Sequence, residues 1–188
     1  MRYYTVDRLG TLNPGMTVIC DTDFTSCRFF PVPDHFTRTD LEALTYQLFT
    51  DGISSHGKKY LLDEYLLIDS PQGPVPYTPH IPMIELVSEL VRRIYFPDKP
   101  SRFTTLFAWG SRDEAVEFQQ QYGTGNIYEV EAEEFFRGDM NLLLLGGSCI
   151  GALQYATMYW KGEGCCTPRW EYLLVPPIHV IDIIDNES

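Results

Sequence analysis

The sequence predicts a single α+β domain that spans residues 1–188. Segments with strand character fill the first and last thirds of the chain, and segments with helical periodicity fill the middle. This order favours antiparallel or mixed strand pairing over a regular βαβ winding. Hydrophobic residues make up 44% of the chain, which is enough for a core, and charged residues make up 21%, which is too few for a disordered chain.

Two short strands are expected at the start of the chain. Residues 3–6 and 16–20 are apolar and β-branched, and a turn at residues 13–15 (Asn-Pro-Gly) separates them. Residues 24–37 contain two prolines and are expected to form an irregular loop.

Two helices are predicted in the middle of the chain. Residues 39–42 (Thr-Asp-Leu-Glu) form a capping box that opens the first helix, and Gly52 follows its end. The second helix runs over residues 82–96 and ends at Pro97. The apolar residues that indicate these helices are Leu41, Leu44, Leu48 and Phe49, on one face of the first helix, and Ile84, Val87, Val91 and Ile94, which recur at helical spacing in the second. Residues 53–80 combine a polar loop, an apolar stretch and a proline-rich turn, and they indicate no single element.

The second half of the chain is more regular. Strands are expected at residues 103–108, 127–132, 170–175 and 179–184, and helices at 111–122 and 148–160. In the strand at 127–132, Glu129 and Glu131 alternate with apolar residues, which is typical of a solvated face. The two prolines at 176–177 indicate a bulge or corner, because proline donates no ladder hydrogen bond.

The net charge and the cysteines of the chain indicate which partners and which cellular compartment to expect. The formal net charge of −12 disfavours binding to a phosphate backbone or a membrane surface. Five irregularly spaced cysteines, no apolar signal core at the N-terminus and no apolar run of the roughly 18 residues that span a bilayer predict a cytoplasmic protein with free thiols. A zinc site at Cys165, Cys166 and His179 has poor ligand spacing, so no metal is expected.

Common catalytic motifs are absent from the sequence. There is no Gly-x-x-x-x-Gly-Lys loop and no Gly-x-Gly-x-x-Gly loop. If Ser148 is the nucleophile, residues 147–151 (Gly-Ser-Cys-Ile-Gly) lie one position away from the Gly-x-Ser-x-Gly spacing of a nucleophile elbow, and no histidine is tied to the thiols by spacing. A Cys/His hydrolase therefore remains one alternative.

A lone carboxylate, Glu171, lies within the apolar strand at residues 170–175. Because burying an unpaired carboxylate is expensive, this side chain needs a partner, a cleft or an outward face. Periodicity alone leaves open that Glu171 is a surface residue of an edge strand.

Three segments resemble, in order, the three motifs of the ADP-ribosyltransferases. Residues 3–7 (Tyr-Tyr-Thr-Val-Asp) resemble the first strand, residues 100–109 with the following 111–115 resemble the second motif, and residues 169–173 resemble the strand that carries the glutamate. The histidine that is usual in the first strand is replaced by Thr5, and Arg169 stands where arginine-specific enzymes carry Glu or Gln.

The resemblance implies a split antiparallel or mixed sheet, with residues 20–98 as a helical lobe or insertion. It implies NAD as the substrate, no metal, and Glu171 as the catalytic carboxylate. Arg102 would pair with the pyrophosphate, and Thr104 or Thr105 would orient the ribose. The residues that would bind NAD are Arg2, Tyr4, Thr5, Ser101, Arg102, Thr104, Trp109 and Trp160.

The function that follows from the resemblance is transfer of ADP-ribose to a macromolecular acceptor, either protein or nucleic acid, with NAD hydrolysis as a side activity. The clan includes toxins and phage-defence effectors, which adds a neutralising antitoxin to the expected partners; no membrane is among them. The second alternative is a non-catalytic module of the same fold that binds a nucleotide or a protein.

Overall fold

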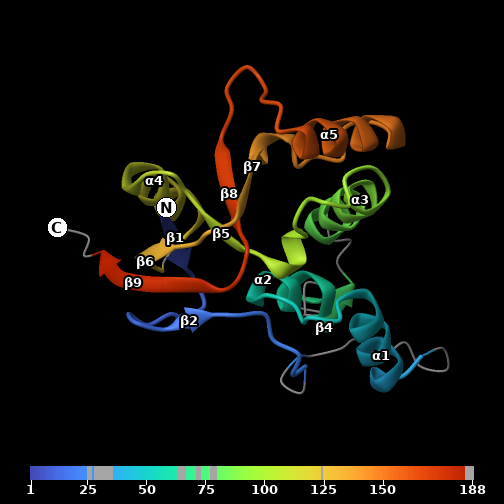
Figure 1. Ribbon diagram of the computed structural model, residues 1–188. Helices are drawn as coiled ribbons and strands as arrows, with labels where there is room; N and C mark the ends of the chain where they lie inside the picture. Colours follow the sequence, from blue (N-terminus) through green and yellow to red (C-terminus); the bar gives the residue numbers. More distant parts are fainter. Residues whose placement is uncertain are drawn as a thin grey trace.

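Three antiparallel β-sheets and five α-helices make up the described part of the chain, so the prediction of an α+β fold is confirmed (Figure 1). The computed structural model describes residues 1–24, 27, 36–62, 67–70, 73–76, 80–123 and 125–184, with the backbone alone at 62, 67–70, 73–76 and 80. The strands are β1 (Arg2–Asp7), β2 (Thr17–Val18), β3 (Leu67–Ser70), β4 (Gly73–Pro76), β5 (Leu106–Ala108), β6 (Asn126–Glu131), β7 (Phe135–Asp139), β8 (Trp170–Leu174) and β9 (Ile178–Ile184). The α-helices are α1 (Arg38–Leu48), α2 (Ser55–Gly57), α3 (His80–Tyr95), α4 (Arg112–Tyr122) and α5 (Cys149–Lys161).

Two of the sheets meet where β1 touches the end of β5. The first sheet has the strand order β1-β6-β9-β2, and the second has the order β5-β8-β7. Tyr4 and Trp109 exchange two backbone hydrogen bonds across the junction, with N···O distances of 3.0 and 2.8 Å. The hydroxyl of Thr5 donates to the carbonyl of Phe107 at 2.7 Å, so β1 is tied to β5 by side-chain as well as backbone contacts.

Strand β8 is central in its sheet, and both of its faces are covered. Leu174 packs between the two sheets with Tyr3 and Val180. Leu173, which points the other way, packs with Trp160 and Val91 from helices α5 and α3. Because successive strand residues point to opposite faces, a strand covered on both sides needs a continuous apolar run, as β8 has around Glu171.

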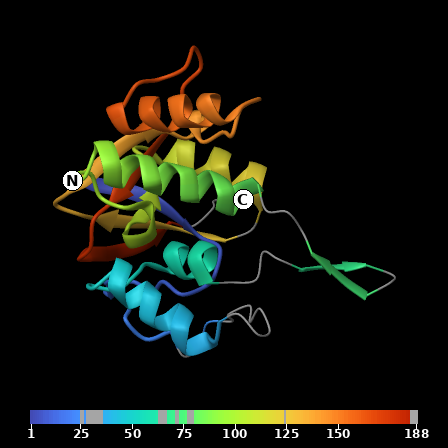
Figure 2. The ribbon, with the colours of Figure 1, turned by 90° about the vertical axis from the view of Figure 1, so that its right-hand side faces the viewer.

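The helices between β2 and β5 lie on the same side of the molecule as α5. Figure 2 shows α5, α3 and α1 one below the other, with α3 running across the front. Strands β3 and β4 pair with each other and with no other described strand, and in Figure 2 they project away from the body. The predicted helical region at residues 20–98 therefore also contains a β-hairpin.

Helix α1 begins two residues earlier than the sequence predicted. Its N-cap is Thr37, whose hydroxyl accepts from the backbone N–H of Asp40 while the Asp40 carboxylate accepts from that of Thr37. Of the apolar residues expected on one face of this helix, Leu44 and Leu48 are 50% and 43% exposed, whereas Phe49 is buried.

The apolar residues that recur at helical spacing in α3 are not all buried either. Val91 is buried, but Ile94 is 66% exposed. The buried positions are instead taken by Glu85, Ser88 and Glu89. The apolar pattern alone does not show which face of this helix is buried, because the buried carboxylates of Glu85 and Glu89 have polar partners inside the molecule.

The other elements of the second half largely agree with the prediction. Helix α4 has the expected capping box, and Glu131 lies on a solvated face while Val130 is buried. Of the strand predicted at residues 103–108, the last three residues form β5; Arg102–Thr104 form a 3-10 turn capped by the Ser101 hydroxyl. Strand β7 was not predicted. Most of the loop expected at residues 24–37 lies outside the described residues.

Candidate functional site

The three segments that resemble transferase motifs lie side by side. Strand β1 meets β5 through the Tyr4–Trp109 bridge, and β5 pairs antiparallel with β8, in the register Leu106 with Leu174. The turn that precedes β5 carries Arg102, and β8 carries Glu171. The first two segments are about 100 residues apart in the sequence, and the last two are about 70 apart. Strand pairing, and not local structure, brings them into one region.

Glu171 lies on the face of β8 that is covered by the helices, and it is 4% exposed. Its neighbour on β7 is Gly138, and the ring of Tyr159 from α5 lies directly against that glycine. A Cβ at position 138 would lie 2.4 Å from the Tyr159 ring, so glycine is required for the tyrosine to approach the strand. The Tyr159 hydroxyl donates to Glu171 Oε1 at 2.7 Å.

Arg102 is the central cation of the site, and its side chain is 5% exposed. It binds Glu85 of α3 with two bonds, Nε to Oε2 at 2.7 Å and Nη2 to Oε1 at 3.0 Å. Its Nη1 donates to Glu171 Oε1 and, at 2.7 Å, to the Tyr159 hydroxyl. The guanidinium also lies over the ring of Phe107, 4.6 Å from the centroid. One buried arginine therefore joins two carboxylates from different elements.

His56 extends the cluster on the far side of Glu85. Its Nε2 lies 3.2 Å from Glu85 Oε1, which is ion-pair distance, although the contact lacks hydrogen-bond geometry. The imidazole packs between the rings of Tyr60 and Phe107, at centroid distances of 4.3 and 4.1 Å. The buried cluster thus consists of His56, Glu85, Arg102, Tyr159 and Glu171, and we call it the Arg102 cluster.

The two carboxyls that share Arg102 differ in proton affinity. Burial raises the pKa of Glu85, but the charge of Arg102, together with the contact to His56, outweighs it and lowers that pKa to about 2. Burial raises the pKa of Glu171, and the opposing influence of Arg102 does not cancel it. Glu85 is therefore the firm counter-ion of Arg102, and Glu171 is the carboxyl that exchanges a proton more readily.

Burial also explains why His56 and Tyr159 are uncharged in the cluster. Burial lowers the pKa of His56 more than Glu85 raises it, so the imidazole is neutral at pH 7. Burial, opposed by Arg102 and reinforced by Glu171, raises the pKa of Tyr159 well above its usual value. The phenol keeps the proton that it donates to Glu171.

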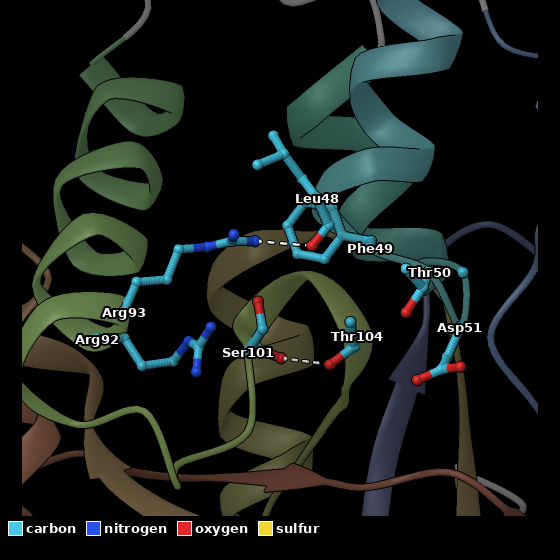
Figure 3. Close-up of a pocket in the computed structure, with 9 residues that line it drawn as sticks. Leu48, Phe49, Thr50, Asp51, Arg92, Arg93, Ser101 and Thr104 are labelled. Carbon is cyan, nitrogen blue, oxygen red and sulfur yellow. Dashed lines mark hydrogen bonds between the residues drawn. The ribbon is translucent and has the colours of Figure 1, made fainter.

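A pocket of about 290 Å³ lies beside the cluster, and we call it the Ser101 pocket (Figure 3). Its lining residues are Leu48, Phe49, Thr50, Asp51, Gly52, Arg92, Arg93, Ser101 and Thr104. Glu89 organises one wall, because it accepts hydrogen bonds from Arg92, Arg93 and the Ser101 hydroxyl. A second pocket, of about 350 Å³, lies beside β2. Glu171 lines neither of these two pockets.

The structure brings only some of the predicted NAD-binding residues to Glu171. Arg102 contacts it directly. Trp160 is fully buried beside Tyr159 and donates from Nε1 to the carbonyl of Ser88 at 2.8 Å. Ser101 and Thr104 line the Ser101 pocket.

The remaining predicted residues lie at the junction of the two sheets or outside it. Thr5 is buried and bonded to the β5 backbone, and Tyr4 packs near Trp109. Trp109 stacks on Phe118 at 4.2 Å. Arg2 points to the surface and pairs with Glu129 at 3.1 Å.

Sequence reasoning missed three members of the Arg102 cluster. Tyr159 was given no role in the site, His56 was considered only as one of four histidines that could serve as a base, and Glu85 was not singled out. A weak signal for Glu85 was present: with Ser88, Glu89 and Arg92 it repeats at helical spacing on α3, which marks a second, polar face. For His56 the sequence offers no signal that we can identify.

Neither a metal-ion site nor a helix able to cross a membrane is present among the described residues. Within the described ranges, no group of three or more His, Cys, Asp or Glu side chains is arranged to hold a metal ion. Over the same part of the chain, no helix combines the length and the apolarity needed to cross a membrane.

Comparison with known proteins identifies a family but no activity. A search of curated proteins finds no match to this chain. A family model described as "Protein of unknown function (DUF2441)" matches residues 35–186, which include α1 and continue to the end of β9. The chain therefore belongs to the DUF2441 family.

Proposed function

We propose that the chain transfers ADP-ribose from NAD to a macromolecular acceptor, with Glu171 as the catalytic carboxylate. The observation that carries the proposal is the position of Glu171: a buried carboxylate on the central strand of a sheet, bonded only to side chains in the described structure. Of the other two segments that resemble transferase motifs, the second supplies Arg102, which contacts Glu171, and the first meets the second through the Tyr4–Trp109 bridge. Two antiparallel sheets joined at β1 and β5 also suit the split sheet of an ADP-ribosyltransferase-like fold.

Cleavage of the bond between nicotinamide and ribose in NAD is favoured by a fixed negative charge near the ribose. The bond between nicotinamide and the ribose C1′ breaks with its electron pair leaving on nicotinamide, so positive charge develops on the ribose, as in glycoside hydrolysis. A buried carboxylate stabilises that charge strongly because the site holds little water. A nucleophile of the acceptor then bonds to C1′ and releases a proton, for which Glu171 is the nearest base of the cluster.

Substrate binding requires a rearrangement of the Arg102 cluster. Arg102 and Tyr159 occupy the carboxylate of Glu171, and a ribose hydroxyl must take the place of at least one of them. Arg102 keeps two bonds to Glu85 when it leaves Glu171, so its charge remains paired. Side-chain donors can be exchanged in this way, whereas strand backbone cannot.

Labelled NAD tests the proposal directly. The protein is incubated with NAD labelled in the adenylate part and with cell lysate, and the product is then treated separately with protease and nuclease. We expect macromolecular label that one of the two treatments releases, which also identifies the acceptor class. Binding of NAD that raises the melting temperature without any label transfer or nicotinamide release would instead indicate a non-catalytic module.

The Glu171→Gln variant tests the assigned residue. It keeps the shape and the hydrogen bond from Tyr159 but removes the charge, so we expect NAD turnover to fall by more than about tenfold with the fold intact. Nicotinamide release is measured beside the unfolding curve. Turnover equal to that of the wild type would remove Glu171 from the catalytic role.

A further inference from the structure

Helix α3 turns an apolar stripe towards solvent. Met83, Leu86, Leu90 and Ile94 are 43%, 45%, 49% and 66% exposed. They are spaced by three or four residues, so they lie on one face of the helix. No described element covers this stripe.

The stripe is exposed because the opposite face of α3 carries polar groups that have partners inside the molecule. Glu85 binds Arg102, and Glu89 binds Arg92 and the Ser101 hydroxyl. An ordinary surface helix buries its apolar face and exposes its charges, whereas α3 buries Glu85 and Glu89 beside Val91 and leaves an apolar stripe exposed. The orientation of α3 is therefore set by its buried polar contacts, and the apolar stripe is left outside.

The two helices beside α3 also expose apolar side chains. Leu44 and Leu48 of α1 are about half exposed, and Ile150 and Leu153 of α5 are 74% and 45% exposed. Arg93 ties α3 to α1 by donating to the carbonyl of Leu48 at 3.1 Å (Figure 3). Figure 2 shows the three helices on one side of the molecule. We call this surface the α3 face: Leu44, Leu48, Met83, Leu86, Leu90, Ile94, Ile150 and Leu153.

The size of the α3 face exceeds that of ordinary apolar patches. Its eight side chains expose roughly 700–800 Å² together, whereas the largest patch on a typical monomer is about 300–600 Å². This is also close to the roughly 800 Å² that each partner contributes to an interface of standard size.

The charge around the α3 face suits a second copy of the same chain. The chain carries a net charge of −12, and two copies repel each other wherever acidic surfaces meet. In helices α1, α3 and α5, however, Glu85 and Glu89 are buried, and the other charged side chains are the basic Arg38, Arg92, Arg93 and Lys161 and the acidic Asp40 and Glu42. The excess acidic charge therefore lies outside these helices, and two copies can join here without bringing like charges together. A basic partner protein, in contrast, would be drawn to the acidic remainder of the molecule.

We propose that the α3 face is the interface of a homodimer, in which the α3 helices of two copies pack against each other about a two-fold axis. Ridges of side chains at three- and four-residue spacing pack into the grooves of an identical helix. A single self-complementary surface closes the assembly at two copies. The proposal is independent of the reaction proposed above.

Sedimentation velocity of the full chain tests the dimer. We expect the wild type to sediment as a dimer over about 1–100 µM, the range in which an interface of this size is populated. The double variant Leu86→Glu/Leu90→Glu should sediment as a monomer, because it places four carboxylates in the joint surface. The matched control is Leu9→Glu, a charge at a 61% exposed leucine outside these helices, which should remain dimeric.

The fold of each variant is checked by its circular dichroism spectrum and unfolding midpoint, since the substituted positions are exposed. Raising the salt concentration should preserve or strengthen the wild-type dimer, because apolar contacts hold it and screening reduces the repulsion between copies. A wild type that is monomeric at about 100 µM overturns the proposal and leaves the face to a different protein. A folded double variant that stays dimeric also overturns it.

Discussion

Two buried carboxylates lie on adjacent strands, and they are held in different ways. Asp139 ends β7 opposite Trp170, and Glu171 lies in β8 opposite Gly138. The Asp139 carboxylate accepts from the backbone N–H groups of Asn141, Cys165 and Arg169, at 3.0, 2.8 and 2.8 Å. The Glu171 carboxylate accepts from the side chains of Arg102 and Tyr159.

The proton affinities of the two groups differ accordingly. Burial raises the pKa of Asp139, but the backbone donors of Cys165 and Arg169 outweigh it and lower that pKa. Burial raises the pKa of Glu171 beyond what its partners offset. Backbone donors are fixed by the fold, and they hold the Asp139 carboxylate, with its lowered pKa, against the loop between α5 and β8. Side-chain donors can be replaced by a substrate, which makes Glu171 the better candidate for chemistry.

Removing the cation of the Arg102 cluster should have the largest effect on stability. Arg102→Met leaves Glu85 and Glu171 buried without their shared partner, and breaking a buried ion pair costs about 3–5 kcal/mol. The free energy of unfolding is measured by urea titration. The control is Arg2→Met at the exposed pair with Glu129, for which we expect a loss within about 0.5 kcal/mol. Equal stability of the two variants would contradict the assigned burial of the cluster.

Asp139→Asn should lower stability without lowering NAD turnover, which would distinguish the structural carboxylate of Asp139 from the catalytic carboxylate of Glu171. An amide cannot satisfy three backbone donors as a carboxylate does, so we expect a loss of about 2–3 kcal/mol in unfolding free energy. Because Asp139 does not touch the Arg102 cluster, nicotinamide release per folded molecule should stay within about twofold of the wild type. A large loss of turnover in a folded Asp139→Asn variant would erase the contrast with Glu171.

Gly138→Ala should disturb the site through packing alone. The added methyl group meets the Tyr159 ring at 2.4 Å, and overpacking of this kind costs about 1–3 kcal/mol. Displacing Tyr159 also removes its hydrogen bond to Glu171, so NAD turnover should fall as well. Gly147→Ala is the matched control, since a methyl group there meets no atom within 4 Å. If both substitutions behave alike, Tyr159 does not depend on Gly138.

The pH dependence of stability should give the smallest signal, with opposite signs for the two carboxylates. The lowered pKa of Asp139 adds stability above the unfolded pKa, and this is lost as the pH falls through the folded pKa. The raised pKa of Glu171 favours the folded state at low pH, and this is lost as the pH rises through the folded pKa. Asp139→Asn should therefore flatten the acid loss of stability seen by urea titration as the pH falls below the unfolded pKa of 3.8, whereas Glu171→Gln should steepen that loss only above the unfolded pKa of 4.5. Matching slopes in the two variants would show that the carboxylates do not differ.

Local signals predicted most of the elements, and long-range contacts account for most of the misses. The capping box at Ser111 and the alternation at Tyr128–Val130 predicted α4 and β6, because both signals lie within a few residues. Strand β7 contains Arg137, Gly138 and Asp139, which do not alternate by polarity, and it is a strand because β8 pairs with it.

The candidate site was predicted in part for the same reason. Glu171 stood out as a lone charge in an apolar strand, and Arg102 was named through the resemblance. Their pairing with Glu85 and His56 depends on how α3 and α2 pack, which no local pattern encodes. The exposed side of α3 could not be predicted either, since apolar periodicity indicates a helix face but not its polar partners.

Nicotinamide release from NAD in the presence of lysate, compared between Glu171→Gln and Asp139→Asn, tests the central claim most directly. Both variants remove one buried negative charge from neighbouring strands. We predict that Glu171→Gln releases nicotinamide more than about tenfold more slowly than the wild type, while folded Asp139→Asn releases it at nearly the wild-type rate. Equal rates for the Glu171→Gln variant and the wild type, or no release by the wild type itself, would contradict the account.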